Sequence, residues 1–326
     1  MKIFSGVVGH SLSPHAREFC DFVDYRIAGK NPISSTLIYS TANYGNLTVP
    51  PNNYPEDTGA AFVRNVDCWA YDVMDQLTAI SVYDGYSVPS GRNRNRMTLI
   101  TPRHVLAAKH TVGPAGVGPL SALSGAYYPN RPKGWVDMNN NIHSAMPLYW
   151  IDLARFRAYP AEASGDACIL VLDRDIPSDV SNMSILPYNF PSLITPRDVT
   201  RGIPIFKTGQ MDELAVMSLL YYGYLFPGVI TIPSELPTPF ISIPDISFTI
   251  PIETIRKQFY TSVLNGDSSC PLMVGYKNNV SFLTTFSSAA SGPAYYLAED
   301  TINDAIVALD SLAGYNTGYK VKVSEY

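Results

Sequence analysis

Residues 99–110 read Leu-Ile-Thr-Pro-Arg-His-Val-Leu-Ala-Ala-Lys-His, and this stretch decides which fold we expect. A short apolar run beside Pro and polar residues is typical of a β-strand, and this one ends on a histidine. Two further stretches follow, Gly-Asp-Ala-Cys-Ile-Leu-Val-Leu at 165–172 and Asn-Gly-Asp-Ser-Ser-Cys-Pro-Leu at 265–272. The three supply a hydroxyl that can act as a nucleophile, together with the imidazole and the carboxylate that can activate it.

The three stretches resemble the active-site motifs of the trypsin/chymotrypsin family of serine proteases. The run ending in His110 is similar to the family's Ala-Ala-His, and Asp166 opens an apolar strand as the family's aspartate does. Gly-Asp-Ser-Ser-Cys-Pro around Ser268 takes the place of Gly-Asp-Ser-Gly-Gly-Pro. The order His, Asp, Ser also differs from that of subtilisins and α/β-hydrolases. The resemblance implies an all-β fold, a chymotrypsin-like double β-barrel with the three residues in its cleft.

The resemblance also implies a role for each residue. Ser268 would be the nucleophile, His110 the general base, and Asp166 the carboxylate that orients the imidazole and stabilises its charged form. Backbone N–H groups of Gly266 and Ser268 would form the oxyanion hole. The implied activity is that of an endopeptidase that acts on a peptide or protein substrate through an acyl-enzyme, with no metal or cofactor. We therefore expect His110 to lie within hydrogen-bonding distance of both Ser268 and Asp166.

The specificity pocket can be placed by the same resemblance. Ser262 lies six residues before Ser268, where an acidic residue would select Lys or Arg substrates. Thr285, Phe286 and Ser287 resemble the family's Ser-Trp-Gly wall. A neutral pocket floor favours substrates with an apolar or aromatic residue before the scissile bond.

Several residues depart from the family pattern. Ser269 and Cys270 replace two glycines, and their side chains would crowd the turn unless its backbone is reshaped. Lys109 replaces a small residue, and Thr111 stands where vertebrate members carry a disulfide cysteine. These departures keep open a second hypothesis. The chain could be a structural or binding component of a virion, an appendage or another assembly, on a protease-like scaffold with weak or no activity.

Activation by N-terminal cleavage is not expected. No sequence resembling Arg-Ile-Val-Gly-Gly precedes His110. In the digestive enzymes a freed N-terminus pairs with the aspartate before the nucleophile, so Asp267 needs another partner, either a side chain or backbone donors. We expect a domain that is competent as synthesised, as in bacterial and viral members of the family.

His104 is the rival candidate for the base. It lies within the predicted strand, and a lone histidine beside an apolar run is usually structural. We therefore interpret His104 as a structural residue. His10, His15 and His143 lack any comparable sequence context.

Composition excludes several function classes. Among 326 residues, 46% are hydrophobic and only 16% charged, which favours a large core. A net charge of −5 argues against a nucleic-acid partner, and we interpret the basic run at 91–96 as a solvated loop. No run of eighteen apolar residues occurs, so we expect no membrane partner. The 22 tyrosines favour the second hypothesis, and the possible protein partners include a homo-oligomer or a larger assembly.

The cysteines and the start of the chain carry little information on location. The four cysteines have no metal-ligand spacing and do not occupy the family's disulfide positions, so the fold should not depend on disulfides. The first ten residues make a poor signal peptide because their apolar stretch is short and broken. Localisation is therefore unknown, with an extracellular or virion-associated setting favoured over a cytoplasmic one.

Four regions are expected along the chain. Residues 1–58 should form an N-terminal helix and extended arm, 59–185 the first barrel, 186–298 the second barrel, and 299–326 a C-terminal helix and tail.

Local signals refine this division. Ser13-Pro14 is a helix start, and apolar residues at helical spacing continue to Ile27. Residues 31–60 are predicted to be extended. Residues 203–255 alternate β-branched residues with Pro, which predicts edge strands or strands interrupted by bends. A last helix should present Ile302, Ala305, Ile306, Leu309 and Leu312 on one face and end at Gly314.

Overall fold

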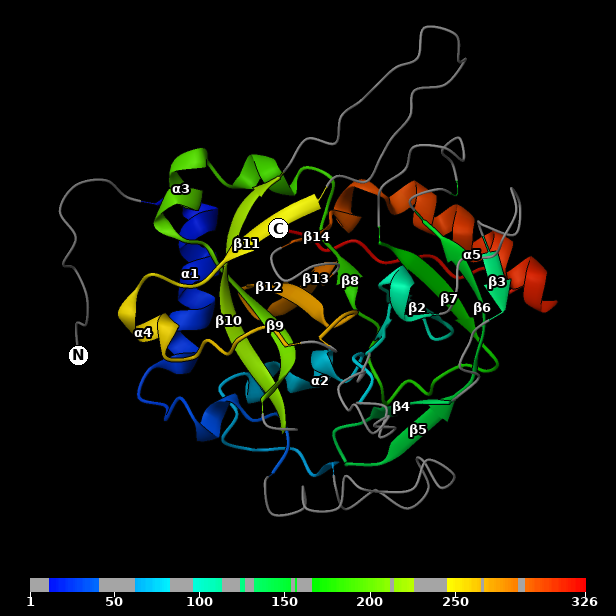
Figure 1. Ribbon diagram of the computed structural model, residues 1–326, viewed down its shortest axis with the longest axis horizontal. Coiled ribbons are helices and arrows are strands. Elements are labelled where there is room, and N and C mark those ends of the chain that lie inside the picture. The colour runs from blue at the N-terminus through cyan, green and yellow to red at the C-terminus, as the bar shows by residue number, and fades with distance from the viewer. Residues whose placement is uncertain are drawn as a thin grey trace, which may run out of the picture.

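A computed structural model describes residues 12–40, 62–82, 96–112, 124–126, 132–153, 156, 166–211, 214–225, 245–264, 267–286 and 291–326. Within these residues the protein is mainly β-sheet, with fourteen strands and five α-helices (Figure 1). The predominance of β-structure confirms the all-β class that the resemblance implies.

The elements are short, apart from β10 and the two terminal helices. The strands are β1 Thr98–Leu99, β2 His104–Ala107, β3 Ser124–Ala126, β4 Lys133–Val136, β5 Ile142–Ala145, β6 Pro147–Asp152, β7 Cys168–Leu172, β8 Ser184–Ile185, β9 Pro204–Met211, β10 Leu214–Leu225, β11 Asp245–Thr249, β12 Pro271–Tyr276, β13 Asn279–Thr285 and β14 Ser291–Pro293. The helices are α1 Pro14–Ile27, α2 Met74–Leu77, α3 Pro196–Arg201, α4 Thr254–Lys257 and α5 Glu299–Ala313.

The strands make two main sheets and a hairpin. The order is β1-β2-β7-β6-β3 in a five-stranded sheet and β14-β11-β10-β9-β12-β13-β8 in a seven-stranded sheet, while β4 and β5 pair with each other. Every pairing is antiparallel except that of β8 with β13. The predicted boundary at residue 185 assigns β8 to the first barrel, whereas β8 pairs with β13 of the seven-stranded sheet. Apolar side chains of both sheets contribute to one large buried cluster.

The register of β2 and β7 positions the candidate site. β7 is the central strand of its sheet, and all five of its residues are buried, as its continuous apolar sequence requires. β2 runs antiparallel beside it, with Ala107 opposite Cys168. The chain just after β2 therefore lies beside the chain just before β7, and this brings His110 close to Asp166.

The strands of the Pro-containing region differ from the prediction. β9 and β10 lie inside the seven-stranded sheet and pair along eight consecutive residue pairs from Pro204 to Met211 of β9. The expectation of edge or interrupted strands was therefore wrong for these two. Pro204 is tolerated because it is the first residue of β9. Residues 226–244, which contain most of the prolines behind that expectation, lie outside the described residues.

The N-terminal helix was predicted correctly. Ser13 caps α1 by accepting a hydrogen bond from the N–H of Ala16, and Pro14 is the first helical residue. The helix packs on β12 and β9 of the seven-stranded sheet. The extended arm was predicted wrongly at its start, since Ser34–Thr36 form a 3₁₀ turn. Residues 41–61 lie outside the described residues.

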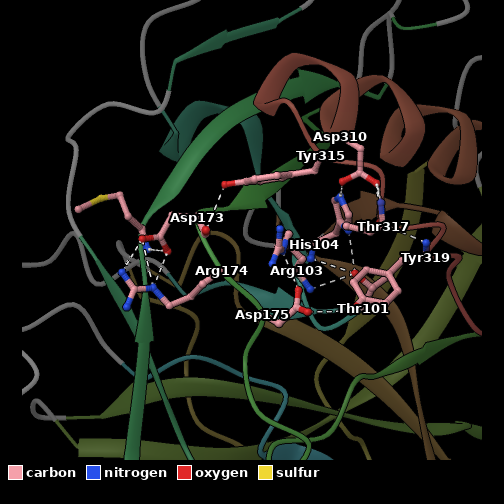
Figure 2. A network of polar contacts seen from close by, with 11 residues as sticks. Thr101, Arg103, His104, Asp173, Arg174, Asp175, Asp310, Tyr315, Thr317 and Tyr319 are labelled. Atoms are coloured by element: carbon pink, nitrogen blue, oxygen red, sulfur yellow. Dashed lines mark hydrogen bonds and ion pairs between the residues drawn. The ribbon is translucent and has the colours of Figure 1, made fainter.

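The C-terminal helix also matches the prediction. α5 covers β6 and β7, its buried residues include Ile302, Ala305, Ile306 and Leu309, and Gly314 ends it in the left-handed conformation (Figure 1). Leu312 is half exposed, in contrast to the expected apolar face. A polar network then holds the tail against the five-stranded sheet (Figure 2).

His104 belongs to this network and is buried beneath α5. Its Nδ1 lies 2.8 Å from Thr101 Oγ1, and its Nε2 lies 3.2 Å from Asp310 Oδ1, a contact with poor hydrogen-bond alignment. Thr101 Oγ1 accepts the N–H groups of Arg103 and His104, so its proton is available to Nδ1. His104 therefore carries its proton on Nε2 and is neutral. Burial lowers its pKa, against an opposing effect of Asp310.

This environment predicts a pH-dependent stability. A histidine with a lowered pKa in the folded state takes up its proton first in the unfolded state, whose value is about 6.5. The free energy of unfolding should therefore fall by about 1–2 kcal/mol between about pH 7 and pH 5 because of His104. Urea unfolding at several pH values gives the free energy of unfolding of the wild type and of His104→Gln as a function of pH. The contribution of His104 is the difference between the two pH dependences. Equal pH dependences of the two proteins would contradict the prediction. The raised pKa of His110 acts in the opposite direction, but His110 is present in both proteins, so its contribution cancels in the comparison.

Candidate active site

His110 lies on a 3₁₀ turn, Lys109–Thr111, that directly follows β2; we call it the histidine turn. The first N–H groups of a helical turn have no partner within it and must find one elsewhere. Here the N–H of Lys109 donates to the carbonyl oxygen of Asp166 at 3.4 Å, and the N–H of His110 donates to Asp166 Oδ1 at 2.8 Å. The backbone itself therefore fastens the histidine turn to the aspartate.

The two side chains are joined as well. His110 Nδ1 is in hydrogen-bonding contact with Asp166 Oδ2, and the His110 side chain is 51% exposed. The hydrogen bond to Asp166 is the largest influence on His110 and raises its pKa against the opposing effect of burial. The aspartate thus fixes the ring and leaves Nε2 as the nitrogen available to another group.

Ser268 lies on a second turn, Asp267–Cys270, that leads directly into β12; we call it the serine turn. Ser268 is partly exposed. Among the described residues no hydrogen bond joins Ser268 to His110. The structure therefore contains the expected His110–Asp166 contact without the expected hydrogen bond between His110 and Ser268. Catalytic hydrogen bonds are often long before a substrate binds.

The two turns are nevertheless tied together through Ser269. Its hydroxyl accepts the N–H of Ala108 at 2.8 Å and lies 2.8 Å from Thr111 Oγ1. The expected crowding at this position is relieved because Ser269 adopts a left-handed conformation, with φ +67°, and directs its side chain into a buried site. Ser269 is fully buried and Ser268 is partly exposed, so Ser268 is the more accessible of the two adjacent serines.

Asp267 has the partner that its sequence context requires. Lys207, on β9, places Nζ 2.9 Å from Asp267 Oδ2, and both side chains are completely buried. The same oxygen accepts the N–H of Leu264 at 3.0 Å. Lys207 was not predicted as this partner. A lone cation in the apolar run Ile205-Phe206-Lys207 was the available signal, because a buried lysine needs a carboxylate.

The predicted pocket residues lie around this ion pair. Ser262 is exposed, and its carbonyl oxygen accepts a hydrogen bond from Lys207 Nζ at 3.2 Å. Phe286 is buried, 5.3 Å from the Lys207 ammonium at its ring centre, and Thr285 is buried beside it. Ser287 and the proposed oxyanion donor Gly266 lie outside the described residues, so both assignments stay predictions.

Two other departures from the family pattern have structural partners. Lys109 Nζ lies 2.7 Å from Oδ2 of the buried Asp152, so the long side chain turns away from His110 toward β6. Cys270 is fully buried, and burial raises its pKa to about 12. A thiol with such a pKa is neutral and packs as a small apolar group. All four cysteines are free and buried.

No cluster of His, Cys, Asp and Glu suited to a metal ion occurs in the described ranges. None of the described helices has the length and apolar character needed to cross a membrane. No protein-family model matches the chain, and no curated protein matches it significantly.

Proposed function

We propose that the protein is a serine endopeptidase of the trypsin/chymotrypsin type, with Ser268 as nucleophile, His110 as general base and Asp166 as orienting carboxylate. The observation that carries the proposal is the double contact of His110 with Asp166, through ring and backbone, at the turn tied to the serine turn. A surface histidine needs no such support. A base that must keep one tautomer and one orientation does.

The sheet topology supports a chymotrypsin-like double barrel. His110 and Asp166 flank strands of the five-stranded sheet, and Ser268 precedes β12 of the seven-stranded sheet. β14 and β13 lie near opposite edges of that second sheet. Gly292 of β14 nevertheless lies so close to the backbone of Thr285 in β13 that a Cβ added to this glycine would be 1.9 Å from the Thr285 carbonyl oxygen. This close approach of distant strands in one sheet is expected when a sheet curls toward a barrel.

The proposed reaction follows from the groups present. His110 Nε2 takes the proton of Ser268 Oγ as that oxygen attacks the peptide carbonyl, and Asp166 stabilises the resulting imidazolium. The protonated His110 then gives the proton to the leaving amine, and the carbonyl carbon stays bonded to Ser268 as an ester. Water repeats the sequence and releases the acid. Because His110 must be neutral to act, its raised pKa places the acid limb of the pH profile above the ordinary histidine value.

The partner of Asp267 bears on how such an enzyme is activated. An internal cation, Lys207, already neutralises Asp267 and is part of the folded chain. This supports a domain that needs no freed N-terminus to form its serine turn.

The second hypothesis keeps one specific observation in its favour. No hydrogen bond joins Ser268 to His110 among the described residues, and a protease-like scaffold that serves as a structural or binding component with weak or no activity requires none. Under this hypothesis the fold is retained and acylation is absent.

Reaction with a fluorophosphonate separates the two hypotheses. The proposed enzyme should become labelled, peptide mapping should find the adduct on Ser268, and Ser268→Ala should remove it. Ser269→Ala controls for the neighbouring hydroxyl and should keep the adduct on Ser268, even if it forms more slowly. An unlabelled wild type with a cooperative unfolding transition would reject the endopeptidase.

A further inference from the structure

Ser269 and Thr111 form a hydrogen-bonded ring between the serine turn and the histidine turn. Thr111 Oγ1 donates its proton to the Ala108 carbonyl at 2.7 Å. It has no second proton, so in its 2.8 Å contact with Ser269 the serine must be the donor. Ser269 Oγ in turn accepts the Ala108 N–H at 2.8 Å. Each hydroxyl thus donates once and accepts once, and the ring closes on a single residue of the chain.

We propose that Ser269 and Thr111 are positioning residues, whose hydroxyl groups fix the serine turn against the histidine turn in the geometry that acylation needs. The inference rests on the proposed function. Ser269 follows Ser268 directly, and Thr111 follows His110 directly, so one peptide unit separates each ring member from a reacting residue. Since Ser268 and His110 share no hydrogen bond, the ring is the direct side-chain link between their turns among the described residues.

The choice of residue at 269 supports this role. Its φ of +67° suits glycine, which the family pattern has at this place, and a serine there carries backbone strain. The side chain is fully buried, so it contributes nothing at the surface. What serine adds over glycine is the hydroxyl, and the ring uses both of its hydrogen-bonding functions.

Four variants test the ring by the rate of fluorophosphonate labelling. Ser269→Ala, Ser269→Gly and Thr111→Val each remove one hydroxyl, and Thr111→Ser keeps it. We expect the maximal labelling rate to fall about 10- to 100-fold in the first three, with an unchanged half-saturating concentration, because small displacements of reacting groups cost that much. Thr111→Ser should label as the wild type does. Ser269→Ala combined with Thr111→Val should be little slower than either alone, since the ring is lost once.

The two replacements of Ser269 separate positioning from stability. Glycine relieves the strain of the left-handed conformation, so Ser269→Gly should unfold at a higher urea concentration than Ser269→Ala. Both should nevertheless label equally slowly. A Gly variant that labels at the wild-type rate would overturn the inference and leave the proposed function standing. A folded wild type that is not labelled would overturn the proposed function, and the positioning role with it. This holds even if the unfolding free energies of the single and double variants show that the two hydroxyl groups interact.

Discussion

Replacing His110 with alanine should lower the rate of fluorophosphonate labelling at Ser268 by about 10⁴-fold or more, because members of a catalytic triad act as a unit. Half of the His110 side chain is exposed, and its contacts are with Asp166, so its loss leaves the core intact. The free energy of unfolding in urea should therefore change by less than about 1 kcal/mol. The measurement is the second-order labelling rate of each protein at a pH where the wild type is fully active.

Asp166→Asn is the companion variant and adds a signature in pH. It removes the charge and the hydrogen bond that raise the pKa of His110, so the acid limb of the labelling profile should move to lower pH. The maximal rate should also fall, by about 10⁴-fold, because an amide can hold the wrong tautomer. His143→Ala is the matched control, since His143 also contacts a carboxylate, that of Asp137. If His110→Ala and His143→Ala labelled alike, His110 would not be the base.

The sequence contains much of what forms the proposed catalytic pair. β2 is a short apolar run that ends three residues before His110, and β7 is one that begins two residues after Asp166. Once two such strands pair antiparallel, their flanking residues must meet. The helices α1 and α5 were predictable for a similar reason, because Ser13-Pro14 and Gly314 mark their ends chemically.

The contacts between distant segments could not be predicted. Ser269 accepts a hydrogen bond from a residue 161 positions away, and Lys207 meets a carboxylate 60 positions away. Neither pairing has a local signature, since it depends on how the two sheets pack. The sequence pattern identified only the requirement, a side chain or backbone partner for Asp267 and a reshaped turn at 269. For β9 and β10 a local signal was misleading. The prolines of residues 203–255 predicted edge or interrupted strands, but Pro204 is the first residue of β9 and β10 contains no proline.

Lys207→Met should be the most destabilising single change at the site. It leaves the Asp267 carboxylate buried without its cation, and breaking one side of a buried ion pair costs about 3–5 kcal/mol. The methionine fills a similar volume, so the loss is electrostatic and not a cavity. Labelling of Ser268 should be lost as well, because Asp267 adjoins Ser268 and a carboxylate that has lost the Lys207 ammonium will turn toward water. Unfolding in urea and the labelling rate are the two measurements.

Two comparisons make the result specific to the ion pair. Lys320→Met removes an exposed lysine and should change stability by less than about 0.5 kcal/mol. Lys207→Met with Asp267→Asn removes both charges of the pair and should be more stable than Lys207→Met alone, because the buried carboxylate is replaced together with the ammonium that faces it. A single variant as stable and as readily labelled as Lys320→Met would mean that the pair does not hold the serine turn. The double variant could instead recover stability without recovering labelling. That result would separate the contribution of the ion pair to stability from its contribution to labelling, because the amide at position 267 fills the space of the carboxylate while the Lys207 ammonium that draws the serine turn inward is missing.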